Sequence, residues 1–148
     1  MQSLSPAGLD LIKNSEGFRS STYKDVSGYP TIGYGHKLRI GESYPNGITE
    51  PIADEILSLD VASAARWVGN LVKVPLTQDQ FDALVDFVFN LGAGRLATST
   101  LLRDLNAGNY DAVPDQLELW DHGDLNGREV ELAALKARRA AEAALWRS

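Results

Sequence analysis

Residues 15–38, SEGFRSSTYKDVSGYPTIGYGHKL, decide how the whole chain is interpreted. Short runs rich in Tyr, Thr and Ile alternate with glycines, a pattern typical of strands joined by tight turns. The sequence therefore predicts a small twisted hairpin sheet between Phe18 and Ile40. Few of these residues suit a core, and the segment is rich in polar side chains, which favours a functional surface.

A helix is expected immediately before this segment. Ser5 is a suitable N-cap, Pro6 favours the first helical position, and apolar residues recur at helical spacing through residues 6–14. Gly17 stops the helix, so Glu16 is expected at its C-terminal end.

Two longer helices are predicted after the sheet. The first is a connecting helix over about 50–72. Its inward face is expected to consist of Ile52, Ile56, Leu59 and Ala62. The second begins at a capping box formed by Thr77 and Gln80, ends at Gly92 and has a wide apolar stripe, so it is expected to be the buried central helix. The stripe consists of Phe81, Leu84, Val85, Val88 and Leu91.

Shorter helices are expected at about 99–107 and 110–120, then a polar loop, then a last helix over about 128–146. The predicted fold class is α+β. A small N-terminal lobe with a hairpin sheet, about 1–50, is joined by the connecting helix to an all-α C-terminal lobe, about 75–148, with a cleft between them. The length of 148 residues predicts a single domain.

The composition excludes several classes of protein. Hydrophobic residues make up 44% of the chain and charged residues 23%, which argues against disorder. The absence of cysteine excludes disulfides and thiolate chemistry, and no apolar run is long enough to span a bilayer. Residues 1–10 lack the basic and apolar regions of a signal peptide, so we expect synthesis in the cytoplasm without export by the general route.

The charge pattern argues against a general nucleic-acid binder. The formal net charge is −6, whereas such proteins normally carry a basic patch. The exception is the basic stretch 132–148. Two interpretations of it stay open: a solvated helix with cations favourably placed in its last turns, and a DNA-binding helix that uses Arg138 and Arg139.

Glu16, Asp25 and Thr31 are the candidate chemical groups. We expect burial beside the aromatic hairpin to favour the protonated form of Glu16, as a general acid requires. Asp25 lies on a polar turn beside Lys24 and Ser27, where a carboxylate more easily stays ionised. Two carboxylates in unlike environments suit glycosidic bond hydrolysis: one protonates the leaving oxygen, and the other supports the water or the oxocarbenium-like centre. The Thr31 hydroxyl could hold that water.

Longer motifs carry a family resemblance. Three elements stand at fixed spacing: EGF at 16–18, YKD at 23–25 and TIGYGH at 31–36. They closely resemble the N-terminal signature of the lysozymes of tailed bacteriophages, the endolysins of glycoside hydrolase family 24. Residues 80–92 and 99–108 are similar to that family's central helix and the segment after it, and 135–142 resembles its closing L-x-x-R-R-x-x-E. The resemblance covers nearly the whole chain and implies a lysozyme-like fold.

The resemblance implies roles for single residues. It makes Glu16 the general acid, Asp25 the second catalytic carboxylate and Thr31 the hydroxyl that positions water. His36 matches the motif histidine, and we favour a supporting role, fixing the hairpin by hydrogen bonds, over a catalytic one. Asn90, at the end of the central helix, is expected to line the cleft and contact substrate.

The closing motif leaves a choice between two arginines. Either Arg138 or Arg139 corresponds to the arginine that the family places near the catalytic Glu. The other is expected to be a surface partner of Glu142.

No metal or cofactor is expected. The loop 120–127 hints at a calcium site, but His122 would occupy the first ligand position and Ala133 the place of the bidentate Glu.

The resemblance implies an endolysin that hydrolyses the β-1,4 bond between N-acetylmuramic acid and N-acetylglucosamine in bacterial peptidoglycan, for host cell lysis. Two alternatives are a lytic transglycosylase on the same fold and a module that binds peptidoglycan without cleaving it, and the full set of Glu16, Asp25 and Thr31 favours the hydrolase. We expect a monomer that binds neither nucleic acid nor, stably, the membrane. It is expected to be made in the host cytoplasm and to reach the wall through a holin-type membrane lesion.

Overall fold

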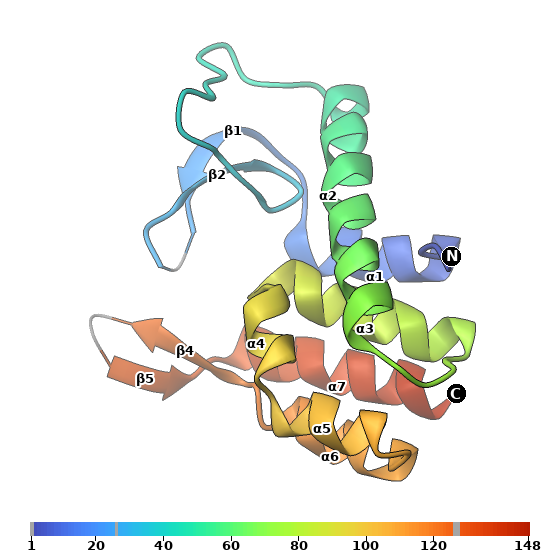
Figure 1. The fold of residues 1–148 in the computed structure, drawn as a ribbon. Coiled ribbons are helices and arrows are strands. Elements are labelled where there is room, and N and C mark those ends of the chain that lie inside the picture. Colours follow the sequence, from blue (N-terminus) through green and yellow to red (C-terminus); the bar gives the residue numbers. More distant parts are fainter. Residues whose placement is uncertain (1, 26, 126–127) are drawn as a thin grey trace.

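The computed structural model describes residues 2–25, 27–125 and 128–148. It has the expected α+β architecture, with a small antiparallel sheet beside one long helix and a group of helices at that helix's C-terminal end (Figure 1).

The first helix, α1 (Pro6–Glu16), forms as the sequence predicts. The Ser5 side chain caps its N-terminus by accepting a hydrogen bond from the Gly8 N–H, and Gly17, with φ of +68°, ends it. Glu16 is therefore the last residue of the helix. α1 packs against α3 (Gln78–Leu91) rather than the sheet, and the Ser5 backbone N–H donates to Asp82 over 3.1 Å.

The sheet consists of β1 (Arg19–Lys24), β2 (Pro30–Gly33) and β3 (His36–Lys37), in the order β1-β2-β3 with both pairs antiparallel. β2 is the central strand, and three of its four residues are buried. Thr31 lies on this strand, opposite Tyr23 of β1 and Lys37 of β3. The hairpin prediction is confirmed.

The connecting helix, α2 (Glu50–Leu71), also forms, but the predicted inward face is wrong. Ile52 and Leu59 are exposed, and Ala62 is exposed as well. The buried residues are Ala53, Leu57, Ala64, Ala65 and Val68. The N-terminal half of α2 stands away from the helical lobe and packs against the sheet, and its Asp54 pairs with Lys13 of α1 (Figure 1). Only a narrow stripe of this half is therefore covered, and Ile52 and Leu59 remain outside.

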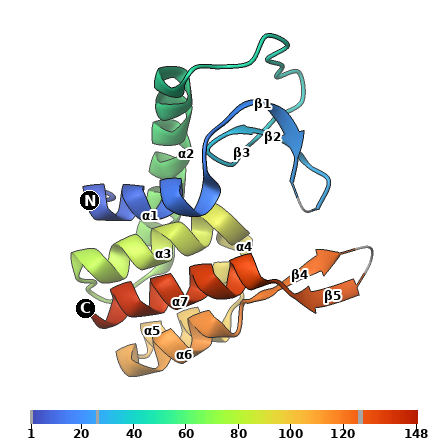
Figure 2. The same ribbon diagram turned by 180° about the vertical axis from the view of Figure 1, so that it is seen from behind.

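The helical lobe is built around α3, whose capping box between Thr77 and Gln80 is present. α4 (Ala93–Ala97), α5 (Thr100–Asn106), the short 3-10 helix η1 (Tyr110–Ala112), α6 (Val113–Glu118) and α7 (Ala133–Arg147) follow. α7 packs along both α3 and α6 (Figure 2). Large buried side chains from these helices form one core: Phe81, Leu84, Phe87, Leu96, Leu101, Leu105, Leu117 and Trp146.

The C-terminal lobe is not all-α, which corrects the prediction. β4 (His122–Leu125) and β5 (Arg128–Glu131) pair as an antiparallel hairpin, where a loop and the start of a helix were expected. The sequence between them is Asn-Gly, a strong signal for a two-residue hairpin connection, although these two residues lie outside the described part of the chain. The last helix therefore begins at Ala133.

Within the described residues, no helix has the length and apolar character needed to cross a membrane. The organisation as one catalytic domain, with lobes bounded at about 1–50 and 75–148, stays a prediction.

Candidate active site

A cleft of about 380 Å³ lies where the sheet, the connecting helix and the end of α3 meet. The sheet contributes the β2–β3 turn and β3, with Gly35, His36 and Lys37. One face of α2 contributes Asp60, Ser63, Ala64 and Trp67. The end of α3 contributes residues 88–91, so the expected cleft between sheet and helices is present.

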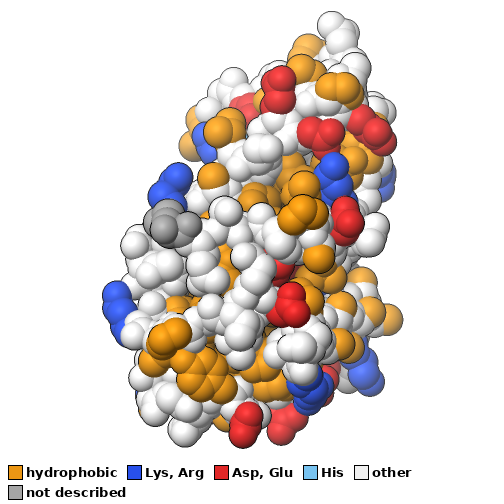
Figure 3. All heavy atoms as spheres, turned by 90° about the vertical axis from the view of Figure 1, so that its right-hand side faces the viewer, with side chains coloured by type: hydrophobic (Ala, Val, Ile, Leu, Met, Phe, Trp, Pro, Cys, Tyr) orange, Lys and Arg blue, Asp and Glu red, His pale blue; other side chains and the backbone are white. Residues whose placement is uncertain are grey.

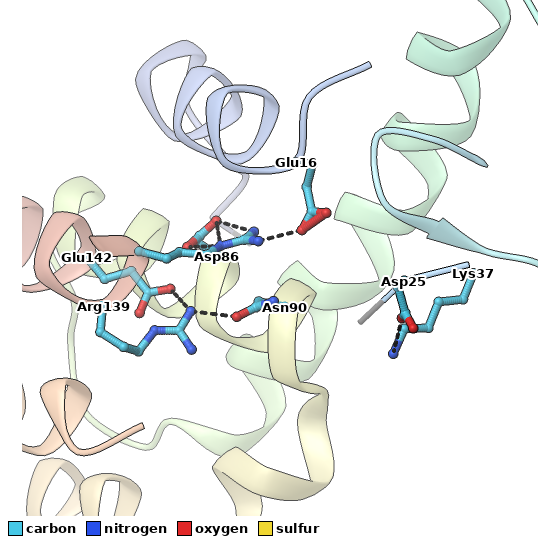
Figure 4. Close-up of polar contacts among 8 residues, drawn as sticks. Glu16, Asp25, Lys37, Asp86, Asn90, Arg139 and Glu142 are labelled. Carbon is cyan, nitrogen blue, oxygen red and sulfur yellow. Dashed lines mark hydrogen bonds and ion pairs between the residues drawn. The ribbon is translucent and has the colours of Figure 1, made fainter. Parts of the chain in front are cut away.

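Glu16 lies next to this cleft and contacts a buried cation. Its Oε1 accepts a hydrogen bond from Nη1 of Arg138 on α7, and only 17% of the Glu16 side chain is exposed. The same guanidinium donates to Asp86 on α3 through Nη2, over 2.8 Å, and through Nε, over 3.0 Å (Figure 4). A cation is therefore the immediate neighbour of Glu16, as the arginine of the closing motif was expected to be.

Arg138, not Arg139, is the arginine beside Glu16. Arg139 lies one position further along α7, is fully buried, and donates to Glu142 over 2.7 Å and to Asn90 over 2.9 Å. The expected surface pairing of Glu142 is wrong, because Glu142 has no exposed area either. Burial of both arginines also contradicts the open interpretation of α7 as a DNA-binding helix that presents them.

Asp86 and Glu142 form a buried carboxyl pair. Burial raises the pKa of Glu142 well above its usual range, and the neighbouring Asp86 raises it further. Burial opposes ionisation of Asp86 too, but hydrogen bonding from Glu142 and the Arg138 cation outweigh it and hold the Asp86 pKa below its usual value. Glu142 is thus the protonated partner and Asp86 the ionised one.

Asp25 is fixed by the turn that follows β1. Its Oδ1 accepts hydrogen bonds from the backbone N–H groups of Ser27, over 2.9 Å, and Tyr29, over 2.8 Å. Its Oδ2 lies 3.9 Å from Nζ of Lys37, on β3 beside the cleft. The backbone therefore holds Oδ1 of Asp25, and Oδ2 faces Lys37, which lines the cleft (Figure 4).

Thr31 is almost fully buried on the central strand, with 2% of its surface exposed. Its hydroxyl donates to the Tyr29 carbonyl over 2.8 Å. Because that bond uses the only hydroxyl hydrogen, Thr31 can bind a water only by accepting from it.

His36 joins three segments. Nδ1 lies 2.7 Å from Oδ2 of Asp60 on α2, and Nε2 lies 3.0 Å from Glu42 in the segment after β3. Burial alone would lower the pKa of His36, but the hydrogen bonds and charges of these two carboxylates raise it. The pKa of Glu42 falls to about 2, because hydrogen bonds from the Arg39 backbone, His36 and Tyr44 outweigh the effect of burial.

Sequence reasoning missed Asp86, Asp60, Glu42 and Trp67. Asp86 stands in the apolar stripe of α3, and a charged residue on a buried helix face requires a buried partner, so this signal was available. Asp60, three residues before Ser63 and seven before Trp67, shares a helix face with them, which the misplaced inward face of α2 concealed.

The suggested calcium loop at 120–127 includes two residues outside the described part of the chain. Among the residues that the structure describes, no group of three or more His, Cys, Asp and Glu could hold a metal ion. On the face drawn in Figure 3, Lys and Arg side chains are scattered among Asp and Glu and form no continuous basic patch.

Comparisons with known proteins agree with the motifs. Residues 13–142 match the family model described as Phage lysozyme. The endolysin of Acyrthosiphon pisum secondary endosymbiont phage 1 is 40% identical over 147 residues, which cover 98% of either chain. A protein named SAR-endolysin, from Bacteriophage PS119, is 37% identical over 85% of this chain and 77% of its own length.

Among solved structures, the muramidase domain of SpmX from Asticaccaulis excentricus has a TM-score of 0.90 and 36% identity, over 100% of this chain and 99% of that one. The family expected from the motifs is therefore confirmed, and the chain belongs to the phage lysozyme family.

Proposed function

We propose that this protein is an endolysin with muramidase activity, which hydrolyses the β-1,4 bond between N-acetylmuramic acid and N-acetylglucosamine in peptidoglycan. The observation that supports this most directly is the pair of carboxylates near one cleft, held in different ways. Glu16 lies against a buried guanidinium, whereas Asp25 is held by backbone N–H groups and lies near Lys37 (Figure 4).

Glu16 is the general acid. Its proton passes to the glycosidic oxygen as the bond to the anomeric carbon breaks, and the sugar that loses the bond gains oxocarbenium character. The Asp25 carboxylate stabilises that positive charge or the water that attacks it. Thr31 holds the water as a hydrogen-bond acceptor, because its own hydrogen is used by the Tyr29 carbonyl. The water hydroxyl joins the anomeric carbon, and its proton leaves to a carboxylate.

Mass spectrometry of the products from purified peptidoglycan tests this function. Hydrolysis leaves a reducing N-acetylmuramic acid end, whereas a lytic transglycosylase leaves an anhydro-muramic end without consuming water. Reducing ends support the muramidase, and anhydro ends would replace it with the transglycosylase. Binding to the wall with no soluble product would indicate a non-cleaving module.

The partner is peptidoglycan, and we propose that the protein acts as a monomer and reaches the wall through a holin-type membrane lesion. Expression in a bacterial host with and without a holin tests the route. Lysis only when the holin is present supports the proposal. Lysis without a holin would favour a route of its own, as the name of the SAR-endolysin relative suggests for that protein.

A further inference from the structure

Arg138 is held from two sides in a way that fixes its guanidinium. Nε and Nη2 both donate to the carboxylate of Asp86, and the remaining Nη1 donates to Glu16. Asp86 has no exposed area, and only 6% of the Arg138 side chain is exposed. A planar guanidinium held by two of its three nitrogens has one orientation left, so Asp86 determines where Nη1 meets Glu16.

The contact also creates an electrostatic conflict. A general acid must carry its proton at the working pH, but a neighbouring cation favours the ionised carboxylate. An anion on the far side of that cation weakens the positive potential that the cation exerts at Glu16. Asp86 is placed there, since it contacts the opposite edge of the same guanidinium.

Glu142 explains how Asp86 stays ionised inside the protein. Glu142 Oε2 accepts from Arg139, and Oε1 is buried with no donor to satisfy it. A proton on the Glu142 carboxyl makes it a hydrogen-bond donor to Asp86, in line with the raised pKa of Glu142. The proton of the carboxyl pair thus stays on Glu142, and the negative charge stays on Asp86 beside Arg138.

We propose that Asp86 is a positioning residue of the active site: it orients the Arg138 guanidinium against Glu16 and offsets part of the positive charge that Glu16 faces. This rests on the proposed role of Glu16 as the acid. The remaining charged or titratable neighbours, among the described residues, act less directly. Tyr23 on β1 is uncharged at neutral pH like any tyrosine, and burial and the nearby Glu16 raise its pKa further. Lys13, on the same helix as Glu16, is paired with Asp54.

The test compares the pH profiles of kcat/KM for two variants that differ only at residue 86: Glu142→Gln alone and Asp86→Asn with Glu142→Gln. Glutamine is neutral, as protonated Glu142 is, and can donate to Asp86 and accept from Arg139. The single variant is therefore expected to keep the alkaline limb of the wild type. In the double variant, the glutamine at position 142 cannot ionise and so cannot replace the negative charge lost at position 86. The alkaline limb of the double variant is therefore expected about one pH unit below that of the single variant.

Arg138→Gln is expected to move the alkaline limb in the opposite direction. Loss of the cation favours the protonated form of Glu16, so the alkaline limb is expected to move about one unit to higher pH. Lower activity at all pH values with unmoved limbs in both variants would mean that Asp86 and Arg138 only support the fold, and would overturn the proposal.

A measurement on the wild type keeps the proposal testable if the double variant does not fold. Carbon-13 NMR of the side-chain carboxyls is expected to show Glu142 protonated and Asp86 ionised at pH 7. An ionised Glu142 at that pH would overturn the charge assignment. This readout needs no activity, so it is separate from a failure of the proposed muramidase function, which the product analysis would reveal.

Discussion

Gly35, in the turn between β2 and β3, lies directly against the side chain of Glu16 at the end of α1. A Cβ atom on Gly35 would stand 2.2 Å from Oε2 and 2.6 Å from Cδ of Glu16. Gly35 also has a φ of +68°, a backbone conformation that residues with side chains rarely adopt. The glycine is therefore required both by the turn and by the place of the carboxylate.

Gly35→Ala is expected to lower activity more than stability. The nearest atoms belong to the end of a flexible side chain, so the fold can survive while Glu16 is displaced. We expect a loss of about 1–2 kcal/mol in the free energy of unfolding from the backbone and of about 10²-fold in kcat/KM. Gly41→Ala is the control, with φ of +85° and nothing within 4 Å of its Cβ. Equal activity in the two variants would contradict the packing role of Gly35.

Glu16→Gln is expected to fold and bind wall fragments but to lose about 10²–10⁴-fold in kcat, because the amide cannot deliver a proton to the glycosidic oxygen. The Gln side chain can still accept from Arg138, which preserves the contact seen in the structure. Turbidity clearing by the variant at a rate near that of the wild type would remove Glu16 from the role of acid.

The His36 cluster predicts a pH window of stability. The folded-state pKa of His36 is raised, so its contribution is fully present below the unfolded value of about 6.5 and is lost as the pH rises through the folded value. The pKa of Glu42 is lowered from 4.5 to about 2, so its contribution is present above 4.5 and is lost as the pH falls towards 2. Both contributions are complete between about 4.5 and 6.5.

Thermal unfolding of Asp60→Asn across pH 4–9 tests this window. The loss in Tm relative to the wild type is expected to be largest near pH 5–6 and to shrink at alkaline pH, where His36 is neutral in both proteins. Asp54→Asn, which breaks a half-exposed pair with Lys13, is expected to change Tm little and evenly above pH 5. A loss for Asp60→Asn that does not vary with pH would mean that the ion pair with His36 contributes nothing specific.

Trp67 is expected to contact the glycan. Trp67 lies on α2 and lines the cleft, and 49% of its surface is exposed. Its indole can therefore stack on the apolar face of a sugar ring. Trp67→Ala is expected to raise KM about three- to tenfold, with a smaller change in kcat. Leu59→Ala, an exposed apolar residue of the same helix that does not line the cleft, is the control. An equal KM for the two variants would exclude the stacking contact.

Activity is expected to be independent of metal ions, since the proposed chemistry uses two carboxylates and a water. Turbidity clearing with and without a chelator measures this. A loss that added calcium restores would direct attention back to the loop 120–127.

The sequence determined much of this protein, because many of its signals are local. The cap at Ser5, the stop at Gly17 and the capping box of α3 depend on neighbours a few residues away, so these boundaries could be predicted. The motif spacing likewise identified Glu16, Asp25 and Thr31 as candidates. It also identified the family.

Only the tertiary structure decided which side chains meet across the chain. Arg138 and Glu16 are separated by 122 positions, and neighbouring residues on a helix point about 100° apart. The rotation of α7 against α3 therefore decides that Arg138 reaches Glu16 and Arg139 reaches Asn90. The buried face of α2 was set in the same way, by what packs against it. A sequence pattern gives the period of a helix, but its rotation is fixed by packing with elements far away in the chain.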